Sequence, residues 1–299
     1  MRVAVVTTSY PSNDRDPSGH FVETEVRELE RDGAVVTVVK PPPGGAFGWP
    51  GVSARIRERP WRLLDAGSFV VRASRELAAA RPQRVIAHWA VPSAFPIARA
   101  VPDAEIEVVS HGADVRLLAA LPRDARERIV LSIARRARMW RFVSTTLLDN
   151  LLRTLSDRTR AAVERITVVR PCLLTMPDVR ADAARRRRDF DGRRLYVCAG
   201  RLVASKRVDK VIDYVASAKG DRVLVVIGDG PERPRLERLA TRWGNGWGMD
   251  VRFVGTRSRR DTLTWLGAAD EIVHASVAEG LSTVVREAEH LGVPLTTLT

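Results

Sequence analysis

The chain has 299 residues, of which 45% are hydrophobic and 28% charged, and its formal net charge is +13. This composition is typical of a soluble globular protein with room for two domains, and it excludes an intrinsically disordered chain. No apolar run approaches the roughly 20 residues of a membrane-spanning helix, and the apolar start MRVAVVTTSYP is too short for a signal peptide.

The charge and the cysteines give weaker information about the partner and the compartment of the protein. Nearly all of the positive charge is arginine, which attracts nucleotides, phospholipid head groups and nucleic acids alike. Charge alone does not choose among these anions. Cys172 and Cys198 have neither metal-ligand spacing nor a disulfide framework, so we expect a reducing cytoplasm.

Apolar segments of strand length alternate with segments of helical period through the first half of the chain. This alternation predicts a parallel sheet that is covered by helices on both faces. The clearest helix is FVETEVRELERDG at 21–33, which ends in a glycine. The predicted strands are 2–10, 35–39, 84–89, 106–112, 141–144 and 166–171.

The composition changes at residues 177–194, which lack apolar periodicity and contain a run of four arginines. We interpret this segment as a solvated linker, because charge runs are usually solvated. The alternation then restarts, with predicted strands at 194–200, 222–230, 251–256 and 271–276. The expected architecture is therefore α/β, with two Rossmann-like domains, 1–176 and 195–299, facing a cleft.

Polar residues and glycines follow several predicted strands of the first domain. His88 and His111 each end an apolar strand, where a histidine can be either a packed residue or a ligand contact. Gly19 precedes the first helix and would let a phosphate or sugar approach the backbone, although a flexible surface loop explains it equally.

The second domain carries a sharper set of candidates. Gly200 ends a strand, and Arg201 and Lys206 flank the loop that opens the next helix, which suits a diphosphate clamp. Ordinary surface basicity is the alternative. Gly228 and Gly230 form part of a nucleotide-binding turn without the full dinucleotide fingerprint.

The segment HASVAEGLSTVVREAEHLGVPL at 274–295 reads as strand, turn and helix, and it holds three carboxylates. Glu279 falls in the turn, whereas Glu287 and Glu289 fall in the helix. A helix N-terminus at the end of a strand suits phosphates, so carboxylates at this place suit hydroxyl groups of a sugar or a ribose.

Residues 126–142 interleave arginines with apolar side chains, including Trp140. This pattern fits either a basic amphipathic helix on an anionic membrane or, as we favour, a core face with a solvated back. On the membrane interpretation, Trp140 lies at the interface and Arg135, Arg136 and Arg138 contact head groups.

With these motifs in place, the sequence resembles the family 4 glycosyltransferases of the GT-B fold. EGLSTVVRE (279–287) fits that family's E-x7-E motif, and GRLVASKR (200–207) and VIGDGP (226–231) precede it in the family's order. SHGAD (110–114) and the opening SYP to SGHFV (9–22) fit less sharply. The resemblance covers the whole chain.

The resemblance implies a role for each candidate residue. Glu287 would hold the ribose of a sugar nucleotide, and Glu279 and His111 would meet the transferred sugar. Amides near Ser282 and Thr283 would bind the diphosphate, with Gly19 nearby. Arg201 and Lys206 would stabilise the departing diphosphate, in place of a metal. The resulting donor-binding set is Gly19, Gly200, Arg201, Lys206, Gly228, Gly230, Glu279, Gly280, Leu281, Ser282, Thr283 and Glu287, and the catalytic set is Glu279, His111, Arg201 and Lys206. Glu289 has no family role and is expected to be solvated.

The resemblance also implies a retaining mechanism with no cofactor and no metal. Members of the family continue well beyond the strand after GVP, whereas this chain stops at Thr299. We therefore expect a shortened C-terminal domain, in which the far wall of the donor site is incomplete.

Three functions compete at this point. The leading one is a cytoplasmic hexosyl or glycosyltransferase, with a glycan, lipid-linked or small-molecule acceptor and a place on the inner membrane face. The second is a non-catalytic remnant that binds a nucleotide sugar. A nucleic-acid-binding protein is disfavoured, because no recognition helix or aromatic platform accompanies the charge.

Overall fold

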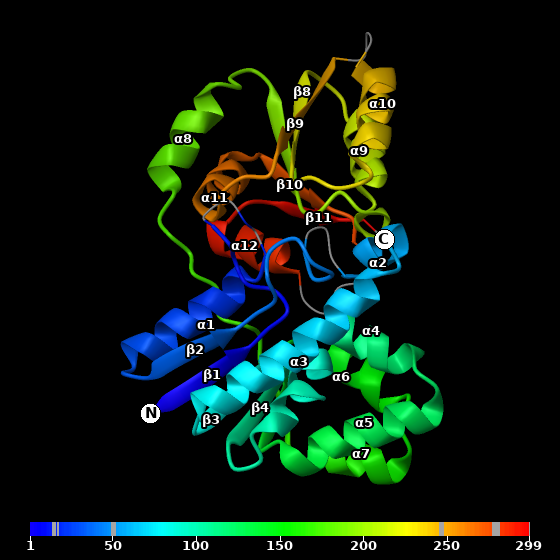
Figure 1. Ribbon diagram of the computed structural model, residues 1–299. Coiled ribbons are helices and arrows are strands. Elements are labelled where there is room, and N and C mark those ends of the chain that lie inside the picture. Colours follow the sequence, from blue (N-terminus) through cyan, green and yellow to red (C-terminus); the bar gives the residue numbers. More distant parts are fainter. Residues whose placement is uncertain (14–15, 17, 49–51, 245–247, 277–281, 299) are drawn as a thin grey trace. The chain divides into compact units, whose positions relative to one another are not determined.

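The computed structural model describes residues 1–13, 16, 18–48, 52–244, 248–276 and 282–298. The chain forms two compact units, one of residues 1–10 and 18–175 and the other of residues 11–17 and 176–299. Figure 1 shows that each unit is a sheet flanked by helices.

The N-terminal unit contains a six-stranded sheet with the order β2-β1-β3-β4-β5-β6, and every neighbouring pair is parallel. Its strands are β1 (Arg2–Val6), β2 (Val35–Val39), β3 (Arg84–His88), β4 (Glu105–Ser110), β5 (Met139–Phe142) and β6 (Thr167–Val169). Its helices are α1 (His20–Arg31), α2 (Val52–Glu58), α3 (Arg62–Ala80), α4 (Ala113–Ala120), α5 (Arg123–Arg136), α6 (Thr145–Leu152) and α7 (Asp157–Glu164), with short turns η1 (Ala90–Ala94) and η2 (Ile97–Ala100). The order reverses between β1 and β3, so this point of the sheet is a topological switch.

The C-terminal unit contains a five-stranded parallel sheet with the order β11-β10-β7-β8-β9. Its strands are β7 (Arg194–Ala199), β8 (Arg222–Ile227), β9 (Met249–Gly255), β10 (Glu271–His274) and β11 (Leu295–Thr297). Its helices are α8 (Arg180–Arg188), α9 (Val208–Ser217), α10 (Arg233–Gly244), α11 (Arg259–Ala268) and α12 (Thr283–Leu291), with the short turn η3 (Ala204–Lys206).

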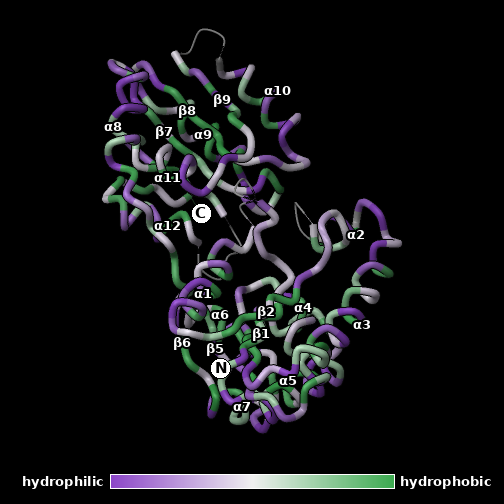
Figure 2. Tube along the Cα trace, turned by 60° about the vertical axis from the view of Figure 1, so that its left-hand side comes forward, coloured by the Kyte–Doolittle hydropathy of each residue, from purple (hydrophilic) through white to green (hydrophobic). Residues whose placement is uncertain are grey.

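Alternate residues of the second sheet face two separate cores. Leu195 and Val197 pack with residues of α8, α11 and α12, whereas Tyr196 and Cys198 pack with residues of α9 and α10. In Figure 2 the strands β7 and β8 are predominantly in the hydrophobic colours, and α8 is largely hydrophilic. A strand that is buried on both faces reads as a continuous apolar run, which explains why the sequence predicted these strands.

All ten predicted strands are confirmed as elements, and most end one to four residues earlier than predicted. The predicted ranges ran on into residues such as Ser9 and Gly230, which belong to the loops at the carboxyl ends of the strands. The α/β fold with two Rossmann-like units is confirmed.

The predicted linker at 177–194 is wrong. Residues 180–188 form α8, and Val179, Ala183 and Phe190 are buried in the core of the second unit. The arginines of this run are solvated on one side only, since the Arg186 guanidinium stacks over the Trp265 ring at 4.3 Å. The helix has too few apolar residues to show a periodic pattern in the sequence. Two or three buried residues are nevertheless enough to hold it against the core.

The structure also corrects the membrane interpretation of 126–142. This stretch is the helix α5 followed by the strand β5, so it presents no continuous amphipathic face. Trp140 lies in β5 with no exposed surface, and its indole nitrogen donates to the Ser110 hydroxyl at 2.9 Å. The Arg136 guanidinium donates to the carbonyls of Val101, Pro102 and Ala104, so its hydrogen bonds stabilise the fold. The favoured interpretation, a core face with a solvated back, is confirmed.

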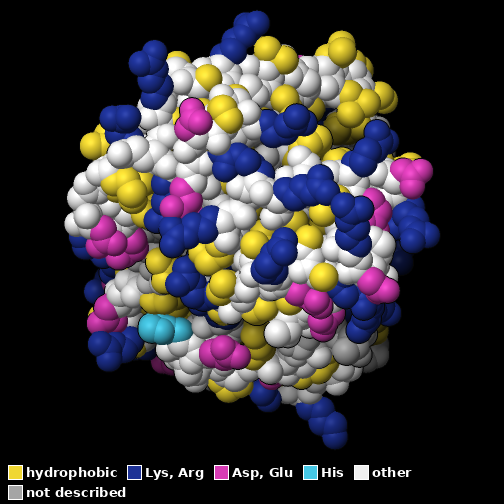
Figure 3. Space-filling view, turned by 90° about the horizontal axis from the view of Figure 1, so that it is seen from below, with side chains coloured by type: hydrophobic (Ala, Val, Ile, Leu, Met, Phe, Trp, Pro, Cys, Tyr) yellow, Lys and Arg dark blue, Asp and Glu magenta, His cyan; other side chains and the backbone are white. Residues whose placement is uncertain are grey.

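On the face seen in Figure 3, the basic side chains are spread out rather than concentrated. The face in Figure 3 shows Lys and Arg side chains scattered among hydrophobic and acidic ones, without a single basic patch. Many of the described arginines pair with carboxylates, for example Arg138 with Glu105 at 2.6 Å and Arg260 with Asp182 at 2.8 Å. The net charge is therefore a weak guide to the partner of this protein.

Candidate functional site

The predicted diphosphate residues lie at the topological switch of the second sheet. β7 and β10 are neighbours there, and the helices that follow them, α9 and α12, pack on opposite faces. Ligands of open α/β sheets bind in the crevice at the carboxyl ends of such strands. Arg201, which is exposed, and Lys206, which is half-buried, both follow β7.

Lys206 acts electrostatically on the ends of both central strands. The pKa of His274, at the end of β10, falls to about 4 because of burial and, second, because of the Lys206 ammonium. Burial raises the pKa of the Cys198 thiol to about 12, and Lys206 opposes that rise. The side chain packs beside Gly200, the residue after β7, where a Cβ atom would lie 3.9 Å from Lys206 Cε.

His274 was missed by the sequence analysis. It is the last residue of β10, it is buried, and its carbonyl accepts a hydrogen bond from the Leu298 amide at 2.7 Å. The signal that singled out His88 and His111, a histidine ending an apolar strand, applies equally to this residue.

Gly228 and Gly230 are required by the packing of two loops. A Cβ atom on Gly228 would lie 1.9 Å from the carbonyl oxygen of Gly200, and one on Gly230 would lie 2.3 Å from that of Leu202. Both glycines also have positive φ angles, 126° and 156°. The loops after β7 and β8 therefore touch through their backbones, which brings Gly200 and Arg201 into place. A direct phosphate contact of these two glycines stays a prediction.

Glu287 is buried inside α12, where it is 2% exposed. Its carboxylate pairs with the guanidinium of Arg259 from α11, and the Arg259 Nη2 atom lies 3.5 Å from the Met176 sulfur. Arg259 thus orients the carboxylate that is predicted to hold a ribose. The sequence offered no signal for this pairing among its many arginines.

Ser282 and Thr283 begin α12, and the Ser282 side chain makes no capping hydrogen bond. The first amides of a helix have no intrahelical acceptor and can meet an anion. Glu279, Gly280 and Leu281 lie outside the described residues. Glu289 is exposed, as expected for a solvated residue.

In the N-terminal unit, the two predicted histidines lie side by side. His88 Nδ1 is 3.0 Å from His111 Nε2, and His111 Nδ1 is 3.6 Å from the Cys172 sulfur. The His111 ring is flanked by Phe21 and Trp89, with centroids at 4.7 and 4.6 Å. Burial lowers the pKa of His88 to about 3 and also lowers that of His111. Both rings are therefore neutral at physiological pH.

Asp114 ties together the two loops that carry these histidines. Its carboxylate accepts from the amides of Ala90, His111 and Gly112 at 2.8 to 3.2 Å. The charge of this buried carboxylate is thus compensated by backbone donors. Gly19, at the start of α1, approaches Ser9 so closely that a Cβ atom would lie 2.1 Å from its carbonyl oxygen. Loop packing therefore accounts for Gly19 without a ligand.

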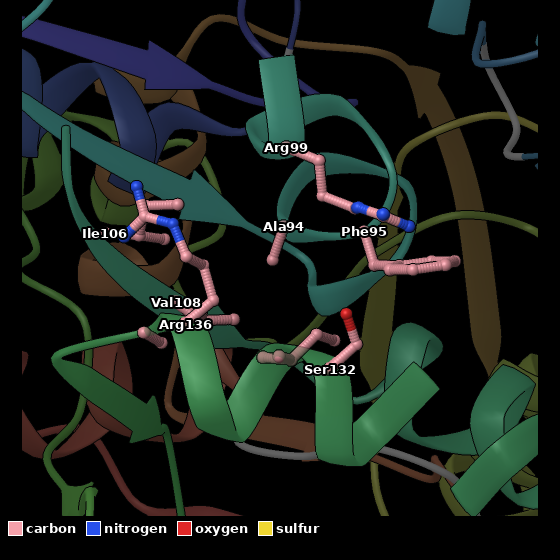
Figure 4. Close-up of a pocket in the computed structure, with 9 residues that line it drawn as sticks. Ala94, Phe95, Arg99, Ile106, Val108, Ser132 and Arg136 are labelled. Carbon is pink, nitrogen blue, oxygen red and sulfur yellow. The ribbon is translucent and has the colours of Figure 1, made fainter. Parts of the chain in front are cut away.

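A pocket of the N-terminal unit lies elsewhere and contains none of the predicted site residues (Figure 4). Its polar lining consists of Ser132 and two arginines, one of which, Arg99, lies 5.5 Å over the Phe95 ring. The other is Arg136, which is engaged by backbone carbonyls. The lining holds no acid or base that could activate the Ser132 hydroxyl as a nucleophile.

Neither a metal cluster nor a membrane-spanning helix occurs in the described part of the chain. Within the described ranges, no group of three or more His, Cys, Asp and Glu side chains is placed to hold a metal ion. In the same part of the chain, no helix is long and apolar enough to cross a bilayer.

The chain is similar to known glycosyltransferases. Residues 180–297 match the family Glycosyl transferases group 1. The putative teichuronic acid biosynthesis glycosyltransferase TuaC of Bacillus subtilis is 24% identical over 335 residues, covering 99% of this chain and 80% of that protein. A GDP-mannose-dependent alpha-mannosyltransferase of Mycobacterium tuberculosis is 31% identical over 119 residues, which cover 40% of this chain and 29% of that protein.

Solved structures show the same fold. Anabaena HepE in complex with UDP-glucose has a TM-score of 0.67 at 18% identity, covering 99% of this chain and 80% of that chain. The fold is that of the GT-B glycosyltransferases. The chain spans less than a third of the mannosyltransferase and about four fifths of TuaC and HepE.

Proposed function

We propose that the protein, whose residues 180–297 match the family Glycosyl transferases group 1, moves a sugar from a nucleotide-diphosphate sugar to an acceptor hydroxyl with retention of anomeric configuration. The observation that carries the proposal is the position of Lys206. Its side chain packs beside Gly200 at the carboxyl end of β7, where a Cβ atom would lie 3.9 Å from Lys206 Cε, and both residues belong to the segment that matches the family.

The described residues supply the parts of such a reaction. Arg201 and Lys206 bind the diphosphate and stabilise the charge that develops as it leaves. The first amides of α12, at Ser282 and Thr283, contribute further donors. Glu287, oriented by Arg259, accepts hydrogen bonds from the ribose. In this proposal no metal is needed, because the two cations perform its task.

Glu279 and His111 complete the proposal as contacts to the transferred sugar. Glu279 is assigned by the motif alone, and His111 lies at the end of β4 among aromatic rings. The similar proteins include both a GDP-mannose-dependent enzyme and a protein solved with UDP-glucose, so the donor panel has to cover several bases.

The direct test is a panel of UDP-, GDP- and ADP-sugars, scored by thermal shift and by released nucleotide. Arg201→Ala and Lys206→Ala should each weaken binding of the nucleoside diphosphate without lowering the melting temperature of the unliganded protein. Lys219→Ala, which removes an exposed cation elsewhere in the unit, is the matched control. Unchanged affinity in both site variants would contradict the clamp. Binding of a sugar nucleotide without any release would instead identify a non-catalytic binding protein.

We further propose that the protein meets its acceptor at an anionic membrane surface through the exposed face of α3. Trp61, Leu63 and Leu64 are 60%, 60% and 77% exposed, which is unusual for three neighbouring large apolar residues. The Arg59 guanidinium lies 5.6 Å from the Trp61 ring, and Arg75, further along α3, is exposed. Each cation near such a surface adds about 1 kcal/mol of binding free energy.

Co-sedimentation with vesicles tests this surface. Binding should require anionic lipid, fall with salt, and weaken when Leu63 and Leu64 become serine. Leu117→Ser, which changes an exposed leucine of α4, and Arg135→Gln, which changes an exposed arginine of α5, should leave binding unchanged. Absence of binding at low salt would remove the membrane from the proposal and favour a soluble acceptor.

A further inference from the structure

A chain of buried polar side chains leads away from His111 into the N-terminal unit. His88, which has no exposed surface, lies between His111 and Glu25, with its Nε2 atom 3.7 Å from Glu25 Oε2. Glu25 is bound by the Arg141 Nη2 atom at 2.6 and 2.8 Å. Arg141 is 1% exposed, so the carboxylate and the guanidinium compensate each other inside the fold.

The position of the protons in this chain follows from the distances. Both imidazoles are neutral, because burial and the Arg141 charge lower their pKa values, so each ring carries one N–H. At 3.0 Å, the pair of atoms His88 Nδ1 and His111 Nε2 must share a single hydrogen. Two lone pairs or two protons at that separation would repel each other.

Only two arrangements meet this condition. In the first, His111 Nε2–H donates to His88 Nδ1, the His88 proton sits on Nε2 facing Glu25, and the Cys172 thiol donates to His111 Nδ1. In the second, every proton is reversed, and the lone pair of His88 Nε2 faces the Glu25 carboxylate at 3.7 Å. The first arrangement is favoured because it points an N–H rather than a lone pair towards the Glu25 carboxylate, an electrostatic contact at 3.7 Å that is too long for a hydrogen bond.

We propose that Glu25 and His88 are positioning residues that hold His111 in the tautomer with its proton on Nε2 and its lone pair on Nδ1. That lone pair accepts a hydrogen bond from a hydroxyl of the donor sugar, which takes the place of the Cys172 thiol at 3.6 Å. The sugar contact rests on the proposed function, whereas the tautomer does not.

Neighbouring residues hold the His88 and His111 rings in their relative positions. Asp114 fixes the backbone on both sides of the pair through the amides of Ala90 and His111. The rings themselves are nearly coplanar, with an interplanar angle of 16°. On its far side, Arg141 Nε lies 3.6 Å from Glu107, so the charge that holds Glu25 is itself anchored. A single proton arrangement can therefore persist without rearrangement of the backbone.

The tautomer is measured directly by long-range ¹H–¹⁵N spectra of the protein labelled at histidine nitrogen. The chain has five histidines, and replacing each in turn by asparagine assigns the signals. We expect the protonated nitrogen to be Nε2 in both His88 and His111, with exposed His290 as the control that averages between tautomers. A proton on Nδ1 of His88 would overturn the proposal.

Two substitutions at the same position extend the test to the sugar. Asparagine can present its side-chain oxygen close to the position of Nδ1, so His88→Asn should preserve the acceptor for His111 Nε2–H, whereas His88→Leu removes it. His88→Leu should lower kcat/KM for the sugar nucleotide about tenfold, His88→Asn much less, and neither should change the affinity for the nucleoside diphosphate. Equal loss in both variants, or equal retention, would contradict the positioning role. If the wild-type protein turns over no sugar nucleotide, the proposed function fails, and the ring spectra still decide the tautomer.

Discussion

At the scale of single residues, the glycines show how a motif can have a purely steric origin. Gly228 combines a positive φ angle of 126° with a backbone contact that leaves no room for a Cβ atom. Other glycines, such as Gly220 with φ of 85°, have the same kind of backbone conformation in open space. At Gly220 a side chain would meet only conformational strain, whereas at Gly228 it would meet strain and a steric clash.

Gly228→Ala should lower the free energy of unfolding by about 3 kcal/mol, against about 1 kcal/mol for Gly220→Ala, because only the first adds a clash to the strain. Urea denaturation of both variants measures the difference. Equal losses would mean that the contact between the loops after β7 and β8 is not a constraint on the fold.

The buried histidines make stability depend on pH. His88 and His274 have pKa values of about 3 and about 4 in the folded protein, below the ordinary value of 6.5. As the pH falls below about 6.5, the two histidines are protonated in the unfolded chain but stay neutral in the folded chain. The free energy of unfolding is therefore highest above that pH and falls as the pH drops towards 4. Each group contributes up to about 1.4 kcal/mol per pH unit in this window.

Chemical denaturation at pH 7.5, 6.0 and 5.0 checks this expectation. His88→Asn should reduce the loss on acidification, whereas His290→Asn, which changes an exposed ring, should not. A wild-type free energy of unfolding that stays constant between pH 7.5 and 5.0 would show that the rings are protonated inside the fold.

At the scale of elements, α8 shows that a helix can be integral with little apolar surface. Ala183 is 4% exposed and faces Gly267 of α11, where a Cβ atom would lie 3.2 Å from that of Ala183. Ion pairs of the arginine run with α11 and with Asp270 hold the rest of the helix. The close approach of the two helices depends on small residues at the contact.

Ala183→Leu should therefore overpack this contact and cost about 1–3 kcal/mol of stability. Ala184→Leu, at the exposed neighbouring position, adds the same side chain to the same helix without a clash. Differential scanning calorimetry of the two variants gives the comparison. If both melt like the wild-type protein, α8 does not pack as described.

At the scale of the whole molecule, the two units each have their own sheet and core. A ligand that binds the C-terminal unit should stabilise that unit by about 2.7 kcal/mol at a hundredfold excess over its dissociation constant. Hydrogen exchange in the presence of a nucleoside diphosphate locates the effect. We expect slower exchange in the loops after β7 and β8 and in the first turn of α12, and little change in the N-terminal sheet. Equal protection of the N-terminal sheet would contradict a diphosphate site built by the C-terminal unit.

The strands, the two α/β units and the candidate residues at the strand ends could be predicted from the sequence alone. This was possible because strands buried on both faces are continuous apolar runs, and because the carboxyl ends of parallel strands share one edge of a sheet. The motifs that resemble the family 4 glycosyltransferases indicated the same loops.

Which strands are neighbours could be read only from the tertiary structure. The strand orders, and hence the switch between β7 and β10, depend on pairings between segments far apart in the chain. The ion pairs Arg259–Glu287 and Arg141–Glu25 also follow only from the tertiary structure. Among so many arginines, the sequence does not indicate which one lies beside a given carboxylate. The sequence pattern favoured a core position for Trp140 over a membrane one, and the burial of strand β5 confirms the core position.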